Sequence, residues 1–216
     1  MQQNKITTIG VTGITGSGTS TVSSILAERG GFVTHADKLA HEAMHKTEPA
    51  FAEIIQIFGK DILTASGEIN RRALGAKVFG NKEDLAKLEK IIHPRVIQRT
   101  RTIFDKIADH GAHTFAVIDA PLLIESGLNS MCDSIWLITA PDDQRISRIT
   151  TRDKIDESTA KRRLSSRSGD ETLKKQANII IQNNGSLIAL RSKIETVLKA
   201  MSLKKHGFEG LEILEI

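Results

Sequence analysis

Residues 6–21 read ITTIGVTGITGSGTST, an apolar run followed by a loop of Gly, Ser and Thr. The loop matches the phosphate-binding template G-x-x-x-x-G-K-[ST], with Gly13 and Gly18 at the required spacing and Ser20 at the hydroxyl position. Glycines at these places let backbone N–H groups turn around phosphate oxygens, and the following helix directs its positive end at the same anion. The stretch therefore predicts a strand, a phosphate-binding loop and a helix, in that order.

One position departs from the template, because Thr19 occupies the lysine slot. Lysine would bring a full positive charge to the β- and γ-phosphates, whereas threonine offers a neutral hydroxyl. Losing one such stabiliser typically costs on the order of 10²–10³ in rate, so we expect phosphate binding to survive better than catalysis. A glycine-rich turn without a ligand is the alternative. If the loop binds ATP, the expected contacts are Gly13, Ile14, Thr15, Gly16, Ser17, Gly18, Thr19, Ser20 and Thr21.

Outward from the loop, short β-rich runs alternate with longer helical stretches, which is typical of parallel βαβ units. We expect strands at residues 6–12, 32–35, 113–119, 134–139 and 178–182. We expect helices at residues 19–29, 141–152 and 186–200, and a mostly helical stretch over 37–111 with turns near Pro49, residues 59–67 and His93-Pro94. Residues 153–176 are polar and predict a helical cap or lid.

The composition is that of a globular domain, with 216 residues of which 39% are hydrophobic. The net charge of +4 suits anionic ligands but is too small for a nucleic-acid-binding face. A single cysteine, Cys132, excludes a disulfide within the chain and a cysteine-based zinc site. We expect no signal peptide, no membrane span and a cytoplasmic location.

Several further motifs, in this order, resemble the dephospho-CoA kinase family. They are HADKLAHEAM at 35–44, GEINRRAL at 67–74, LEKIIHP at 88–94, IDAPLLIESGL at 118–128, RITTRD at 148–153 and NNGS at 183–186. With the loop, the resemblance covers about residues 6–200. It implies ATP-dependent phosphorylation of the ribose 3′-hydroxyl of dephospho-CoA, which gives coenzyme A and ADP and uses Mg²⁺. The expected partners are these small molecules, with no nucleic acid and no membrane, in a monomer or small homo-oligomer.

The resemblance also implies an α/β P-loop kinase fold, with a five-stranded parallel sheet and helices on both faces. All of residues 1–216 would form one domain. Its core would comprise residues 1–36, 112–152 and 177–200, with a helical acceptor-binding insert at 37–111 and a lid at 153–176. No role is expected for the tail at 201–216.

Individual roles follow from the same resemblance. Asp37 would orient or deprotonate the acceptor hydroxyl, although an aspartate there also suits a helix N-cap. Other acceptor contacts would come from Arg71, His93 and Leu122. Nucleotide contacts outside the loop would come from Arg148, which also serves catalysis, and from Arg152 and Asn184. The Mg²⁺ ligands would be Ser20 and Asp119.

The chain departs from the family's pattern at more than the lysine slot. Ile14 stands where glycine is usual, Arg167 stands where the family favours glutamine after the lid helix, and Asn178 replaces an aspartate. Arg145 lies near a further common glutamine. Three hypotheses follow. The extra arginines replace the missing lysine charge, as an arginine finger can; the chain binds nucleotide or CoA precursor without efficient turnover; or it phosphorylates a different hydroxyl acceptor.

Overall fold

The computed structural model describes residues 6–165, 170–203 and 214–216. The chain forms two compact units, one made of residues up to 34 together with residues from 107 onward, and the other made of residues 35–106. The assignment of the second unit to acceptor binding, and of residues 153–176 to a lid, stays a prediction.

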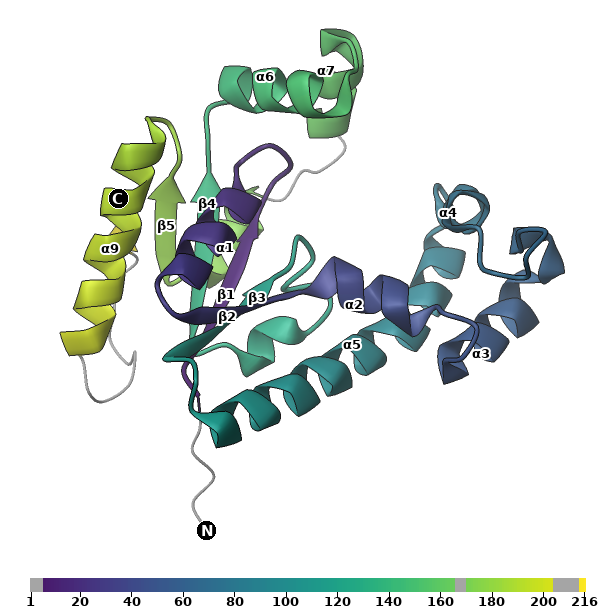
Figure 1. Cartoon of the computed structure of the whole chain (residues 1–216). Helices are drawn as coiled ribbons and strands as arrows, with labels where there is room; N and C mark the ends of the chain where they lie inside the picture. Colours follow the sequence, from purple (N-terminus) through teal and green to yellow (C-terminus); the bar gives the residue numbers. More distant parts are fainter. Residues whose placement is uncertain (1–5, 166–169, 204–213) are drawn as a thin grey trace. The chain divides into compact units, whose positions relative to one another are not determined.

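The first unit is built on a sheet in the order β2-β3-β1-β4-β5-β6 (Figure 1). Its strands are β1 (Thr8–Gly13), β2 (Gly31–His35), β3 (Phe115–Asp119), β4 (Ser134–Thr139), β5 (Ile179–Gln182) and β6 (Leu214–Glu215). β1 pairs in parallel with β3 on one side and β4 on the other, and β5 pairs in parallel with β4. The predicted parallel sheet is confirmed. The chain runs from β1 to β2 on one side of β1 and from β3 to β4 on its other side, so the strand order reverses beside β1. Open α/β sheets bind ligands at the carboxyl ends of the strands at such a point.

β6 was not predicted. Its two residues pair in parallel with β5, through Leu214 opposite Ile179 and Glu215 opposite Ile180. A run this short carries no periodic signal in the sequence. It extends the predicted five strands by one short strand at the edge next to β5.

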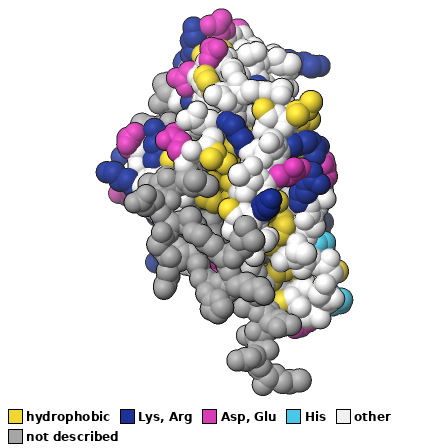
Figure 2. All heavy atoms as spheres, turned by 90° about the vertical axis from the view of Figure 1, so that its left-hand side faces the viewer, with side chains coloured by type: hydrophobic (Ala, Val, Ile, Leu, Met, Phe, Trp, Pro, Cys, Tyr) yellow, Lys and Arg dark blue, Asp and Glu magenta, His cyan; other side chains and the backbone are white. Residues whose placement is uncertain are grey.

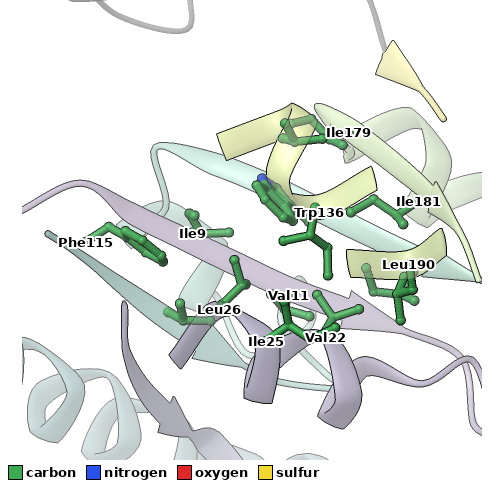
Figure 3. Packing of buried hydrophobic residues seen from close by; sticks show 14 residues of the cluster. Ile9, Val11, Val22, Ile25, Leu26, Phe115, Trp136, Ile179, Ile181 and Leu190 are labelled. Atoms are coloured by element: carbon green, nitrogen blue, oxygen red, sulfur yellow. The ribbon is translucent and has the colours of Figure 1, made fainter. Parts of the chain in front are cut away.

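Two helices cover one face of this sheet, α1 (Thr19–Glu28) and α9 (Leu187–Leu203). Alternate residues of the strands point to them, as the two-residue period of a strand requires. The resulting buried cluster includes Ile9, Val11, Trp136, Ile181, Val22, Ile25, Leu26 and Leu190 (Figure 3). All six residues of β1 are buried, so the strand that carries the loop lies in the middle of the core.

Ion pairs join the exposed sides of the same two helices. Arg29 pairs with Glu195, and Arg191 pairs with Glu28. Figure 2 shows basic and acidic side chains interspersed among the described residues of the face that it presents. Exposed pairs of this kind contribute little to stability, typically about 0–1 kcal/mol each.

The opposite face of β1 accommodates a close approach. A Cβ at Gly10 would lie 2.7 Å from both Cys132 Sγ and Leu123 Cδ2, so a larger residue would displace one of them. Leu123 is fully buried. Gly10 therefore lets the segment after β3 pack directly on the central strand.

The thiol of the half-buried Cys132 gives a pH-dependent prediction. Burial, with a smaller effect of the negative Asp133, raises its pKa from 9.0 to about 12. We expect alkylation by iodoacetamide at pH 8.5 to be about 10²–10³-fold slower in the folded protein than in urea, because the thiolate is the nucleophile. The unfolded thiol ionises first, so its contribution to stability falls as the pH rises from 9 toward 12. Equal alkylation rates with and without urea would contradict this assignment.

Between β4 and β5, the described residues form the helices α6 (Asp142–Asp153), α7 (Glu157–Ser165) and α8 (Asp170–Gln176). The helical nature predicted for the polar segment is therefore confirmed in its described part. Asp156 precedes α7 and accepts a hydrogen bond from the Thr159 N–H at 2.8 Å. It acts as the N-cap of this helix.

The second unit contains α2 (Ala36–Ala43), α3 (Pro49–Phe58), a short 3₁₀ helix at Lys60–Ile62, α4 (Arg71–Val78) and most of α5 (Lys82–His110). The predicted turn at His93-Pro94 is wrong, because α5 continues through Pro94. Pro94 has no N–H to donate to the preceding turn. The Arg95 guanidinium donates to the nearby Ile91 carbonyl at 2.6 Å. Among the described helices, α5 included, none is long and apolar enough to cross a membrane.

Candidate functional site

The loop between β1 and α1 adopts the shape that the glycines predict. Gly16 and Gly18 have φ values of +83° and +97°, a region that favours glycine. The Gly18 carbonyl accepts from the N–H groups of Thr21 and Val22, which starts α1. Gly18 is the N-cap residue and has no side chain to cap the helix, so the first N–H groups of α1 are available to an anion.

Three consecutive loop carbonyls are held from outside the loop. The Thr15 carbonyl accepts from Arg145 Nε at 3.1 Å. Arg148 Nη1 donates to the carbonyls of Gly16 and Ser17 at 3.2 and 3.3 Å, and Asn183 Nδ2 donates to Ser17 at 2.8 Å. These contacts come from α6 and from the residue after β5, so distant segments fix the loop's conformation.

The loop glycines are also required by close packing. A Cβ at Gly13 would lie 2.5 Å from the Ile138 carbonyl oxygen, and one at Gly18 would lie 2.3 Å from Asn183 Nδ2. Both distances are shorter than any relaxed carbon contact. The glycines at the two ends of the motif are therefore needed by the fold as well as by a ligand.

Replacing Gly18 by alanine should test this requirement. We expect Gly18→Ala to lower the free energy of unfolding by about 1–3 kcal/mol and to abolish measurable MgATP binding, because alanine is strained at positive φ and displaces Asn183. Gly80→Ala is the matched control, since Gly80 has φ +89° and nothing within 4 Å of the added carbon. Urea unfolding and titration calorimetry measure both effects. A Gly18→Ala protein that binds MgATP like the wild type would contradict the assignment.

The arginines predicted to contact the nucleotide lie in different surroundings. Arg148 is half-buried against the loop and also donates to the Asn183 carbonyl at 2.9 Å. Arg152, one turn along α6, pairs with Asp153, which pairs with Arg163 as well. Hydrogen bonding and charge from Arg152, with a further contribution from Arg163, lower the pKa of Asp153. The structure brings only Arg148 of this pair to the loop. Arg167 lies outside the described residues.

The Asn-Asn-Gly turn after β5 contributes a residue that the sequence did not single out. Asn184 is exposed, and its carbonyl accepts from Gln144 Nε2 at 3.2 Å. Its neighbour Asn183 is buried and contacts the loop directly. The doubled asparagine was visible in the sequence, but only the fold shows which of the two points to the loop.

Two other departures from the family's pattern have structural surroundings. Ile14 is buried, and its carbonyl accepts from the Ser17 N–H at 3.0 Å. Asn178 Oδ1 accepts from the Ile135 N–H at 2.8 Å, which ties the start of β5 to β4. Ile14 therefore takes part in the turn of the loop, whereas Asn178 serves strand pairing at the start of β4.

The residues predicted for Mg²⁺ are oxygen donors near the loop. Ser20 is exposed in the first turn of α1. Asp119 is buried at the end of β3, opposite Val11, two residues before the strand ends in the loop. No group of three or more His, Cys, Asp or Glu residues that could hold a metal occurs in the described part of the chain. Mg²⁺ in kinases is usually held by one or two protein oxygens with phosphates and water, so the donors present fit it.

In the second unit, the structure groups two of the predicted acceptor residues around a histidine. Asp37 is the second residue of α2 and His35 is the N-cap, so the alternative role of Asp37 as N-cap is wrong. Arg71 Nη1 lies 2.7 Å from His41 Nδ1 and 2.8 Å from His41 Nε2. Partial burial and the Arg71 charge lower the pKa of His41, while the Asp37 carboxylate acts in the opposite sense. His41 was not predicted as a site residue.

The two remaining predicted acceptor residues have less distinctive surroundings. His93 is half-buried on α5 in the second unit. Leu122 follows β3 in the first unit and is 36% exposed. Their roles stay predictions.

Comparison with known proteins gives a consistent result. The family described as dephospho-CoA kinase matches residues 7–189. Dephospho-CoA kinase from Carboxydothermus hydrogenoformans is 36% identical over 196 residues, which is 91% of this chain and 95% of that protein.

Two solved structures are also similar to this chain. One from Thermus thermophilus is 29% identical with a TM-score of 0.73, and covers 94% of this chain and 99% of its own. Dephospho-CoA kinase from Campylobacter jejuni is 27% identical with a TM-score of 0.58, and covers 90% and 96%. These similarities confirm the predicted P-loop kinase fold.

Proposed function

Because the chain belongs to the dephospho-CoA kinase family, we propose that it transfers the γ-phosphoryl group of ATP to the ribose 3′-hydroxyl of dephospho-CoA, giving coenzyme A and ADP. The observation that carries the proposal is the loop whose Thr15 carbonyl is held by Arg145 and whose Ser17 carbonyl is held by Arg148 and Asn183. Since a peptide is planar, a carbonyl held outward turns the N–H of the same peptide inward. This arrangement suits an anionic phosphate.

The nucleotide would be held mainly by the loop backbone and the N-terminus of α1. Ser17 Oγ is buried and, among the described residues, has no hydrogen-bond partner. A buried polar group without a partner is costly unless a ligand or water satisfies it. We therefore assign Ser17 as an additional phosphate donor.

A divalent cation, which P-loop kinases use with their nucleotide, would neutralise part of the phosphate charge. We propose Mg²⁺, with Ser20 and Asp119 as the protein's contribution. The hydroxyl would coordinate it directly, and the carboxylate would orient its water.

The acceptor would be bound by the second unit. Asp37 would orient the attacking 3′-hydroxyl and accept its proton. Arg71 would contact an anionic group of dephospho-CoA, since a guanidinium matches phosphate geometry. His41 would be neutral near pH 7 and would keep Arg71 in place through their contact.

Direct product detection tests the proposal. The pure protein is incubated with MgATP and dephospho-CoA, and coenzyme A and ADP are followed by mass spectrometry, with a sample lacking dephospho-CoA as the blank. We expect both products in equal amounts. MgATP binding without coenzyme A would instead identify a nucleotide binder or a kinase for another hydroxyl compound.

A further inference from the structure

Arg145 is a buried arginine on the outer side of the loop. It is 6% exposed, its Nε donates to the Thr15 carbonyl at 3.1 Å, and its Nη1 donates to Asp142 Oδ1 at 2.7 Å. Arginine is always protonated in proteins. A permanent charge is therefore built into the wall of a loop whose lysine slot holds Thr19.

We propose that Arg145 is a positioning residue that also supplies part of the positive potential missing at Thr19, so that the loop favours ligands in proportion to their phosphate charge. The inference rests on the proposed function, because it takes an adenine polyphosphate as the ligand. It assigns to Arg145 a role through the loop backbone, without contact with the reacting atoms.

The carboxylate of Asp142 does not fully cancel the charge of Arg145 on the side that faces the loop. The Arg145 side chain is 7% exposed, whereas that of Asp142 is 77% exposed. Water screens the carboxylate far more than the buried guanidinium, since charge interactions strengthen as the local dielectric constant falls. A net positive potential is left on the loop side of the pair.

The same residue fixes the direction of a loop peptide. Its bond to the Thr15 carbonyl holds that oxygen outward, so the Gly16 N–H of the same trans peptide points the other way. The backbone of α6 also approaches closely, because a Cβ at Gly16 would lie 2.9 Å from the Arg145 carbonyl oxygen.

Two of the three arginines of α6 contact the loop, and they bind different carbonyls. Arg148 reaches the carbonyls of Gly16 and Ser17, and Arg145 reaches that of Thr15. Each therefore stabilises a different peptide, and loss of Arg145 leaves the contacts of Arg148 available. The contribution of Arg145 can therefore be measured by mutation while the contacts of Arg148 remain.

The test compares ligands that differ in phosphate number. The full chain is titrated calorimetrically with adenosine, MgADP and MgATP, at low and at physiological ionic strength, for the wild type, Arg145→Gln and Asp142→Asn. Arg191→Gln, which removes an equal charge from the pair between α1 and α9, is the control. We expect Arg145→Gln to weaken MgATP about ten-fold, MgADP less and adenosine not at all, with a smaller loss at higher salt.

Asp142→Asn separates charge from packing. It removes the screening partner but leaves the guanidinium, so we expect MgATP to bind about two- to five-fold more tightly. Two results would overturn the proposed charge role: an equal loss of affinity for adenosine and MgATP in Arg145→Gln, or weaker MgATP binding in Asp142→Asn. Arg145 would then be only a structural contact of the loop. If Arg145→Gln fails to fold, the MgATP affinity of Asp142→Asn alone tests the proposal.

The proposed function and this inference fail in different ways. A wild type that binds MgATP but forms no coenzyme A refutes the kinase reaction, and the titrations still decide the role of Arg145. A wild type that binds no adenine nucleotide refutes both.

Discussion

Replacing Asp37 by asparagine is expected to lower kcat for coenzyme A formation by about 10²–10⁴-fold, the usual contribution of a general base. Asparagine keeps the size and the hydrogen-bonding oxygen of the side chain but cannot accept a proton at neutral pH. Asp37 is exposed in the first turn of α2 and is not its N-cap, so the substitution should not unfold the helix. Steady-state kinetics with mass-spectrometric product detection measure the change.

The binding of MgATP gives the second readout for Asp37→Asn. The nucleotide is assigned to the loop in the first unit, so we expect its dissociation constant to stay within two-fold. Asp61→Asn is the matched control, because Asp61 is an exposed aspartate of the second unit that pairs with Lys77. An Asp37→Asn protein with wild-type kcat would remove Asp37 from the chemistry.

The sequence predicted what short-range patterns determine. β4 begins and ends at the predicted residues, because a run of apolar residues between polar neighbours defines a buried strand. The loop was predicted from the spacing of Gly13 and Gly18, which matches the phosphate-binding template. The turn at Pro94 was wrong because the local preference of proline was outweighed by packing on both sides, where Ile91 and Val96 are buried.

The contacts that build the candidate site are of longer range and could not be predicted in the same way. Asn183 and the loop residue Ser17 that it contacts are 166 positions apart in the chain. Arg71 and His41 are 30 apart. No local period relates such pairs, so the family motifs identified Arg71 while only the fold identified Asn183 and His41.

Restoring the template lysine is expected to raise kcat for coenzyme A formation up to about 10²-fold, the effect of one electrostatic stabiliser. Thr19 is half-buried and is the first residue of α1, so Thr19→Lys adds a cation beside the bound phosphates. Lysine is also a slightly better helix former than threonine, so the change should not destabilise α1. Ser24→Lys adds the same charge at an exposed position of the same helix and serves as the control.

The size of this gain depends on what already supplies charge to the loop. If Arg145 already supplies part of the positive potential at the loop, the lysine of Thr19→Lys adds to it. The increase in kcat caused by Thr19→Lys should then be larger in an Arg145→Gln background than in the wild type. A double-mutant cycle of kcat for the four proteins measures this coupling. Equal gains in both backgrounds mean that the two cations act independently. If well-folded Thr19→Lys shows no gain in kcat in either background, the charge at the loop does not limit phosphoryl transfer. The rate is then limited by a step on the acceptor side.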